Sequence, residues 1–157
     1  MIRAAPLLVV LLLAGCGDSP SPPAGTRFDA LVAGSNGFDS VRAARGAEVY
    51  RANCAICHGA RGDGAPNWQR PGPDGKYPAP PLNGSGHAWH HPYAALKMTI
   101  RDGTVRLGGN MPEWKDKLSD HDIDAVIVWM LSLWPEEIYQ AWLAMDEKSR
   151  RGNSANR

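Results

Sequence analysis

Two cysteines separated by two residues and followed at once by a histidine restrict this chain more than any other feature: Cys54, Cys57 and His58 in the stretch RANCAICHG. Such a group can be a redox dithiol, half of a zinc site, a disulfide or a point of covalent attachment. The sequence predicts a helix over 40–53, which places the pair at the carboxyl end, where the helix dipole disfavours a thiolate. Zinc would need further ligands, and the only other cysteine is Cys16. A disulfide across two residues would be strained and would close almost no loop.

Covalent haem fits this group better than its rivals. Two thiols at this spacing can reach the two vinyl groups on one porphyrin edge, while the adjoining imidazole turns under the ring toward the iron. The sequence therefore predicts one haem c, attached through Cys54 and Cys57, with His58 as an axial iron ligand.

The N-terminus has the pattern of an export signal. Arg3 precedes the apolar run APLLVVLLLAG, which is too short to span a bilayer comfortably, and the run ends in LAGC. This ending resembles the lipobox of bacterial lipoproteins, so we expect residues 1–15 to be removed and Cys16 to carry lipid. An ordinary secretory leader is the alternative. The Ser-, Pro- and Gly-rich residues 16–37 predict a flexible tether, and the domain is expected on the periplasmic side of the bacterial cell envelope, anchored to a membrane by lipid.

Helical patterns dominate the rest of the chain, and no strand alternation is visible, so the predicted fold class is all-α. A domain is expected over 38–148, with a disordered tail over 149–157. Helices are predicted over 40–53, about 92–101, 119–134 and 136–147, the third with Ser119 and Asp122 as a capping pair. A buried stripe is expected at helical spacing from Ile123, Val126, Ile127, Met130 and Trp134.

Charge is balanced, with 17 basic and 16 acidic residues and a formal net charge of +1. Nucleic-acid binding needs a basic face that neutralises phosphates, so this balance argues against a nucleic-acid partner.

The region 40–134 resembles a class I c-type cytochrome of the bacterial monohaem kind. RGAEVYRANCAICHG is similar to the first helix of that family, PPLNG to its proline loop, NMPEW to its methionine loop and AVIVWML to its closing helix. The resemblance implies a small cytochrome c fold, with N- and C-terminal helices crossing around the haem. It also implies electron transfer between redox protein partners rather than catalysis. By the same resemblance, the Pro80 carbonyl accepts the other ring N–H of His58, and Gly46 and Tyr50 meet Trp129.

Met111 is the expected sixth ligand of the iron. It lies in a loop after Gly108 and Gly109, which allow close backbone approach, and before Pro112, which stiffens the chain. Its position before the closing helix matches the axial methionine of the family, and a thioether ligand raises the potential. Met98 and Met130 are instead expected in helix packing, and Met145 near the end of the last helix.

Three histidines surround a tryptophan in the segment GSGHAWHHPY. Either His87, His90 and His91 have structural roles, such as capping the next helix or bonding a haem propionate, or they bind a second metal, since imidazole suits copper and zinc. The functional alternatives follow from these choices: a haem subunit of an exported oxidoreductase, an open-site sensor, or a haem protein with a second metal site at its histidine cluster.

Overall fold

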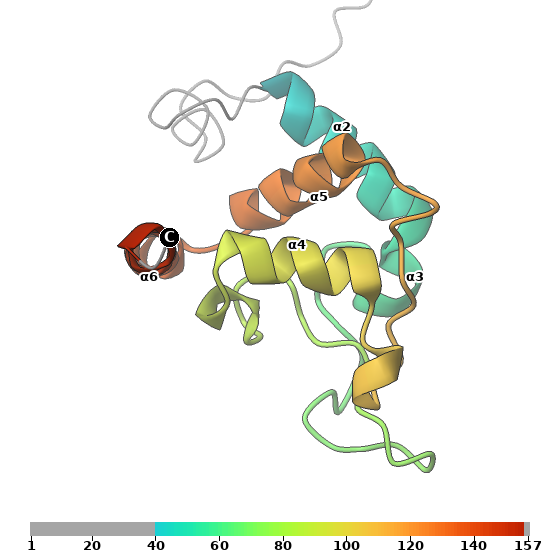
Figure 1. Ribbon diagram of the computed structural model, residues 1–157. Helices are drawn as coiled ribbons and strands as arrows, with labels where there is room; N and C mark the ends of the chain where they lie inside the picture. Colours follow the sequence, from blue (N-terminus) through green and yellow to red (C-terminus); the bar gives the residue numbers. More distant parts are fainter. Residues whose placement is uncertain (1–39, 156–157) are drawn as a thin grey trace, which may run out of the picture.

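The protein is described over residues 40–155 by a computed structural model, and within this range every regular element is a helix, which confirms the all-α prediction (Figure 1). The expected signal peptide, the lipidation site Cys16 and the tether lie outside the described residues. The elements, in chain order, are α2 (Ser40–Asn53), α3 (Ala55–His58), the 3-10 helix η1 (Ala88–His90), α4 (Tyr93–Asp102), the 3-10 helix η2 (Val105–Leu107), α5 (Asp120–Ser132) and α6 (Glu136–Ala155).

Helix α5 occupies the centre of the fold and packs against both α2 and α4 (Figure 1). Its expected stripe is buried, with Ile123, Ile127 and Trp134 fully inaccessible, so that prediction is confirmed. Met130 is also buried, as expected, whereas Met98 is 58% exposed. The inward position of α4 is taken by Leu96 instead, which leaves Met98 on the solvent side.

The two terminal helices of the cytochrome-like region cross at a glycine. A Cβ on Gly46 would overlap the backbone of Ala125 and lie 2.8 Å from the Cβ of Trp129, so only glycine permits this approach. One turn further along α2, the ring of Tyr50 lies 4.0 Å, centroid to centroid, from that of Trp129. The predicted contact between Gly46, Tyr50 and Trp129 is therefore confirmed.

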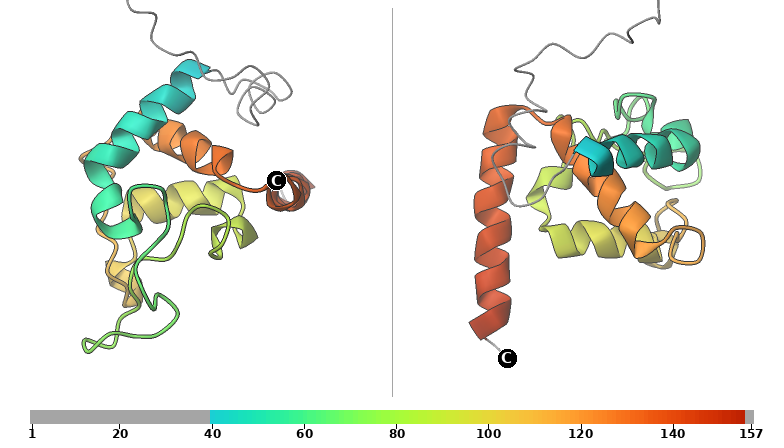
Figure 2. Two further views of the ribbon diagram at one scale, coloured as in Figure 1. Left: turned by 180° about the vertical axis from the view of Figure 1, so that it is seen from behind. Right: turned by 90° about the horizontal axis from the view of Figure 1, so that it is seen from above.

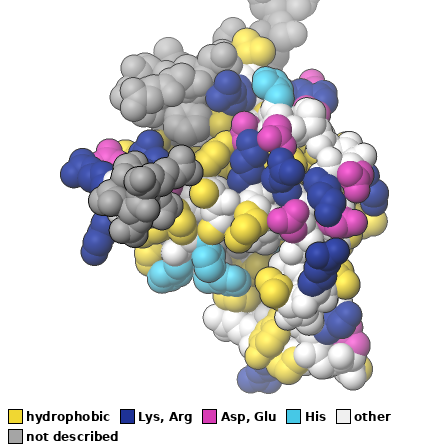
Figure 3. All heavy atoms as spheres, viewed as in Figure 1, with side chains coloured by type: hydrophobic (Ala, Val, Ile, Leu, Met, Phe, Trp, Pro, Cys, Tyr) yellow, Lys and Arg dark blue, Asp and Glu magenta, His cyan; other side chains and the backbone are white. Residues whose placement is uncertain are grey.

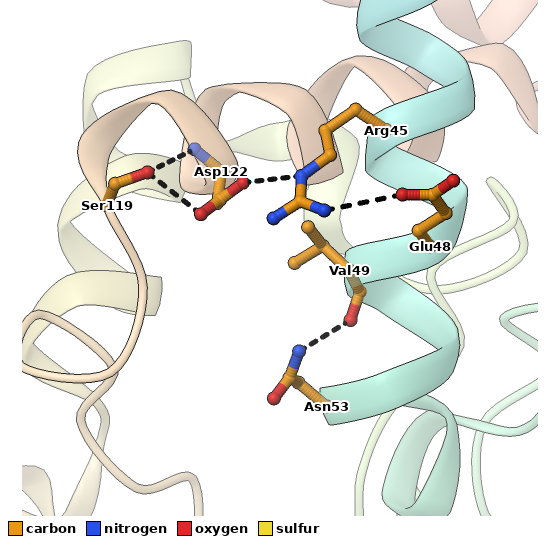
Figure 4. Close-up of polar contacts among 6 residues, drawn as sticks. All are labelled: Arg45, Glu48, Val49, Asn53, Ser119 and Asp122. Atoms are coloured by element: carbon orange, nitrogen blue, oxygen red, sulfur yellow. Dashed lines mark hydrogen bonds and ion pairs between the residues drawn. The ribbon is translucent and has the colours of Figure 1, made fainter.

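The start of α5 is fixed both locally and by α2 (Figure 4). Ser119 is the N-cap, and its hydroxyl accepts the backbone N–H of Asp122 at 3.1 Å, as the capping prediction requires. The Asp122 carboxylate accepts the Ser119 hydroxyl at 2.8 Å and the Nε–H of Arg45 at 2.8 Å. One side chain thus supports the cap and ties α5 to α2.

Helix α4 is capped by a residue that is remote in sequence. The backbone N–H of Tyr93 donates to the Asp146 carboxylate at 2.8 Å, across 53 residues. Asp146 is buried on α6 and also pairs with Arg150 at 3.1 Å. The expectation that a histidine of the preceding segment caps α4 is therefore wrong, because Asp146 fills that position.

The last helix is longer than the sequence predicted. α6 continues to Ala155 rather than ending near Glu147, so residues 149–155 are helical and the expected tail over 149–157 is wrong for that part. Ion pairs one turn apart support the extension, Arg150 with Asp146 and Arg151 with Glu147. The second half of α6 extends along one side of the molecule, away from the other helices (Figure 2).

Within residues 40–155, no helix is both long enough and apolar enough to cross a membrane.

Candidate haem site

The Cys-x-x-Cys-His group forms a helical turn of its own. α2 ends at Asn53, Cys54 precedes α3, and the backbone N–H of His58 donates to the Cys54 carbonyl at 3.0 Å. The predicted helix over 40–53 is confirmed, with Cys54 directly after its end, and a second, four-residue helix that the sequence did not predict begins at Ala55. The side chains of Cys54, Cys57 and His58 all come from this one turn. A planar group can therefore be bound by the two thiols and the imidazole together.

The environment of Cys54 does not favour a thiolate. Burial, followed by the nearby Cys57, raises the pKa of Cys54 to about 11. Cys57 is exposed, and no disulfide joins it to Cys54. A redox-active dithiol requires a lowered thiol pKa, whereas burial raises that of Cys54, so this environment does not suit dithiol chemistry.

His58 is oriented by a backbone carbonyl. Its Nδ1 lies 2.9 Å from the carbonyl oxygen of Pro80, which is the contact that the resemblance implies. Burial lowers the pKa of His58, while the hydrogen bond to Pro80 acts in the opposite direction. A neutral imidazole that donates from Nδ1 presents Nε2 as its free ligand atom, which is the form that binds a metal.

The segment that carries Pro80 packs closely against the turn after His58. A Cβ on Gly64, whose φ is +76°, would lie 2.5 Å from the nitrogen of Pro81, so the two backbones are in direct contact. The Ala65 N–H donates to the Ala79 carbonyl at 2.8 Å, and the Gly64 N–H donates to the His58 carbonyl at 2.8 Å. These contacts place the carbonyl of Pro80 beside the imidazole.

Met111 lies in a loop fixed by its backbone. Its N–H donates to Thr104 Oγ1 at 3.1 Å, and its carbonyl accepts the Thr104 N–H at 2.9 Å. The loop follows η2 and leads toward α5. These contacts hold the backbone at Met111 without joining it to His58, so its role as the sixth ligand stays a prediction.

The histidine segment does not form a metal site. Histidine side chains gather on one part of the surface in Figure 3, but in the described residues no three His, Cys, Asp or Glu side chains are grouped to hold a metal ion. His90 instead stacks on Trp89 at 3.7 Å between centroids, and His87 stacks on Trp68 at 5.8 Å. His87 and His91 meet edge to face at 5.8 Å between centroids, but the described residues bring no third ligand to them, so the structure does not support the expected second metal site.

Sequence reasoning missed several groups that shape this region. The Tyr50 hydroxyl donates to the Gly59 carbonyl at 2.6 Å, which fixes the chain directly after His58. Trp134 Nε1–H donates to the Leu82 carbonyl at 2.8 Å, and Trp142 Nε1–H donates to the His91 carbonyl at 2.9 Å. The two tryptophan partners lie more than 50 residues away in sequence, so no local pattern could have found them.

The residues at this site fit a covalent haem c. Two thiols and an imidazole with a defined free nitrogen come from one turn, and the surrounding fold is all-helical. This fold and this donor set define a c-type cytochrome.

Comparison with known proteins narrows that class. The family model for cytochrome c oxidase, cbb3-type, subunit III matches residues 41–130, more than half of the chain, and the protein belongs to this family. The chain is 35% identical over 95 residues to the Cbb3-type cytochrome c oxidase subunit CcoP of Azospirillum sp. (strain B510), covering 60% of this chain and 30% of that protein. It is 33% identical over 102 residues to the Cbb3-type cytochrome c oxidase subunit FixP of Azorhizobium caulinodans, covering 65% of this chain and 31% of that protein.

The chain therefore spans about a third of the length of the curated relatives it matches. No solved structure shows a significant match.

Proposed function

We propose that this protein is a one-electron carrier: a monohaem cytochrome c whose iron is held by His58 and Met111. The observation that carries the proposal is the single turn containing Cys54, Cys57 and His58, with the imidazole Nδ1 held 2.9 Å from the Pro80 carbonyl. When bound, haem c supplies a one-electron ferrous/ferric couple.

The chain's own residues have separate tasks in this proposal. Cys54 and Cys57 supply the two thiols that attach the group, and His58 supplies an imidazole nitrogen in a fixed orientation. Pro80 accepts the Nδ1–H of His58, which raises the basicity of the ligand nitrogen. Met111 would supply a thioether as the second iron ligand from the chain. With His58 and Met111 both bound, the iron would have no open site for small ligands, which would favour electron transfer over ligand chemistry.

A potentiometric titration followed by absorption spectroscopy tests this function. We expect a single one-electron step, with low-spin spectra in both oxidation states and no change on adding carbon monoxide to the ferrous protein. A high-spin ferrous spectrum that shifts with carbon monoxide would contradict the proposal and would indicate a sensor or a catalyst.

We further propose that Cys16 carries lipid and anchors the domain to a membrane on the periplasmic side. The support is the LAGC sequence, followed by the Ser-, Pro- and Gly-rich residues 16–37. Cell fractionation tests the anchor: the natural chain is expected with the membranes, and Cys16→Ser is expected to remove the lipid. Membrane association that is unchanged in Cys16→Ser, with no acyl chain found by mass spectrometry, would contradict it.

The comparisons favour a second candidate, in which this cytochrome is a haem subunit of an oxidase complex. Both named relatives are described as subunits of a cbb3-type cytochrome c oxidase, and the matched family has the same description. Purification of the tagged full chain in mild detergent separates the two candidates. Stable co-purification of oxygen-reducing activity supports the subunit, whereas recovery of the cytochrome alone supports the independent carrier.

A further inference from the structure

Trp134 is a fully buried tryptophan whose polar atom is bonded to the proline loop. It follows the end of α5, its side chain is 0% exposed, and its Nε1–H donates to the Leu82 carbonyl at 2.8 Å. It also lies beyond residues 41–130, the part of the chain that the family model matches.

Leu82 is the second residue after Pro80, and both its backbone N–H and its backbone carbonyl are hydrogen-bonded. Its N–H donates to the Gly62 carbonyl at 2.8 Å, which ties it to the turn that follows His58. Its carbonyl is taken by Trp134. The segment Pro80–Leu82 is therefore fixed between the haem-binding turn on one side and the indole on the other.

Packing around the indole reinforces this arrangement. A Cβ on Gly84 would lie 3.4 Å from Trp134 Cδ1 and 2.7 Å from Pro135 Cδ, so the proline loop runs directly against Trp134 and Pro135. Without the indole N–H, the Leu82 carbonyl would lose its partner, and the segment could move away from the imidazole.

We propose that Trp134 is a positioning residue for His58, acting through Leu82 on the carbonyl of Pro80. The inference rests on the proposed function, because it takes His58 as the iron ligand. A well-placed Pro80 carbonyl draws on the Nδ1–H of His58 and makes Nε2 a stronger donor, which favours ferric iron. Loosening the segment weakens that hydrogen bond and shifts the couple toward ferrous iron.

The test compares Trp134→Phe with Trp142→Phe in the haem-loaded full chain. Both residues are buried, and each donates its indole N–H to a backbone carbonyl, but Trp142 bonds to His91, eleven residues after Pro80. Both variants are expected to lower the melting temperature. Only Trp134→Phe is expected to shift the ferrous/ferric equilibrium, by about threefold to tenfold toward ferrous, since partners of metal ligands have effects of this order or larger.

NMR of the diamagnetic ferrous protein gives a second readout. The His58 Nδ1–H is expected to exchange with solvent at least tenfold faster (on the order of the loss of one hydrogen bond) in Trp134→Phe and at the natural rate in Trp142→Phe. Equal potentials and equal His58 exchange in natural protein and Trp134→Phe would overturn the inference. So would identical shifts in the two variants, which would indicate general loosening.

The natural protein provides the test if Trp134→Phe does not fold. The ring N–H protons of Trp134 and His58 are then expected to exchange with solvent through the same local opening of the structure, with the same temperature dependence. The ring N–H proton of Trp142 is expected to exchange through a different opening. Independent exchange of Trp134 and His58 would overturn the inference. If the natural protein itself lacks a His58-ligated low-spin haem, the proposed function fails instead, and the two failures are thereby distinguished.

Discussion

At the scale of single residues, Met111 is fixed by its backbone rather than by its side chain. Thr104 bonds to both the N–H and the carbonyl of Met111, which leaves the thioether without a constraint from those contacts.

Replacing Met111 with alanine tests the sixth ligand. We expect Met111→Ala to keep the haem attached, because the thiols are unchanged, but to give a high-spin iron that binds carbon monoxide. Loss of the thioether should also lower the reduction potential. We expect the ferrous/ferric equilibrium to shift toward ferric iron on the order of a hundredfold, and each tenfold shift of a one-electron couple corresponds to about 59 mV.

Met98→Ala is the matched control, since Met98 is exposed on α4 and is expected to leave both spectrum and potential unchanged. A low-spin spectrum and natural potential in Met111→Ala would assign the sixth position to another residue.

At the scale of helices, the crossing of α2 and α5 depends on the absence of a side chain at Gly46. We expect Gly46→Ala to destabilise the protein by about 1–3 kcal/mol, because the added Cβ overlaps the backbone of Ala125. Denaturant unfolding measures this effect. Gly152→Ala is the control: Gly152 lies in α6 with open space around it, and alanine there should be neutral or stabilise by up to about 1 kcal/mol. Equal stability of Gly46→Ala and the natural protein would contradict the close approach.

The ion pair between the same two helices predicts a dependence on pH. The hydrogen bond from Arg45, followed by that from Ser119, holds the pKa of Asp122 below its ordinary value. A lowered folded-state pKa means that this contribution to stability is fully present above the unfolded pKa, about 4, and is lost as the pH falls through the folded pKa.

Asp122→Asn should therefore be less stable than the natural protein at neutral pH, and the difference should shrink below about pH 4. Urea unfolding at several pH values measures it, with Glu48→Gln as the control. Glu48 contacts the same arginine at 3.3 Å but from an exposed position. A difference that stays constant with pH would show that the carboxylate charge has no part in the pairing.

The same elements show what the sequence could predict and what it could not. The cap at Ser119 and the buried stripe of α5 were predictable because each depends on neighbours within a turn or two. The Asp146 cap on α4 was not, because its partner is 53 residues away and a buried aspartate has no periodic signal. The position of His87 has the same origin, since its stacking on Trp68 depends on tertiary packing.

At the scale of the whole molecule, the cytochrome-like region and the C-terminal helix form one structure. Residues 41–130 match the family model, yet Trp142 and Asp146 of α6 bond to His91 and Tyr93 in the segment that leads into α4. The spacing of Cys54, Cys57 and His58 predicted the haem-binding turn because those residues are close together, and the resemblance predicted its proline partner. The hydrogen bonds of Trp142 and Asp146 on α6 were not predicted, because neither residue belongs to a motif that the sequence analysis could recognise.

The most direct measurement of the central claim is the mass of the denatured chain after expression with export and haem-attachment machinery. We expect one haem that stays with the unfolded polypeptide through two thioethers. A Cys54→Ser, Cys57→Ser double variant should carry none. A natural chain whose mass shows no haem after denaturation, or two intact thiols, would contradict the account.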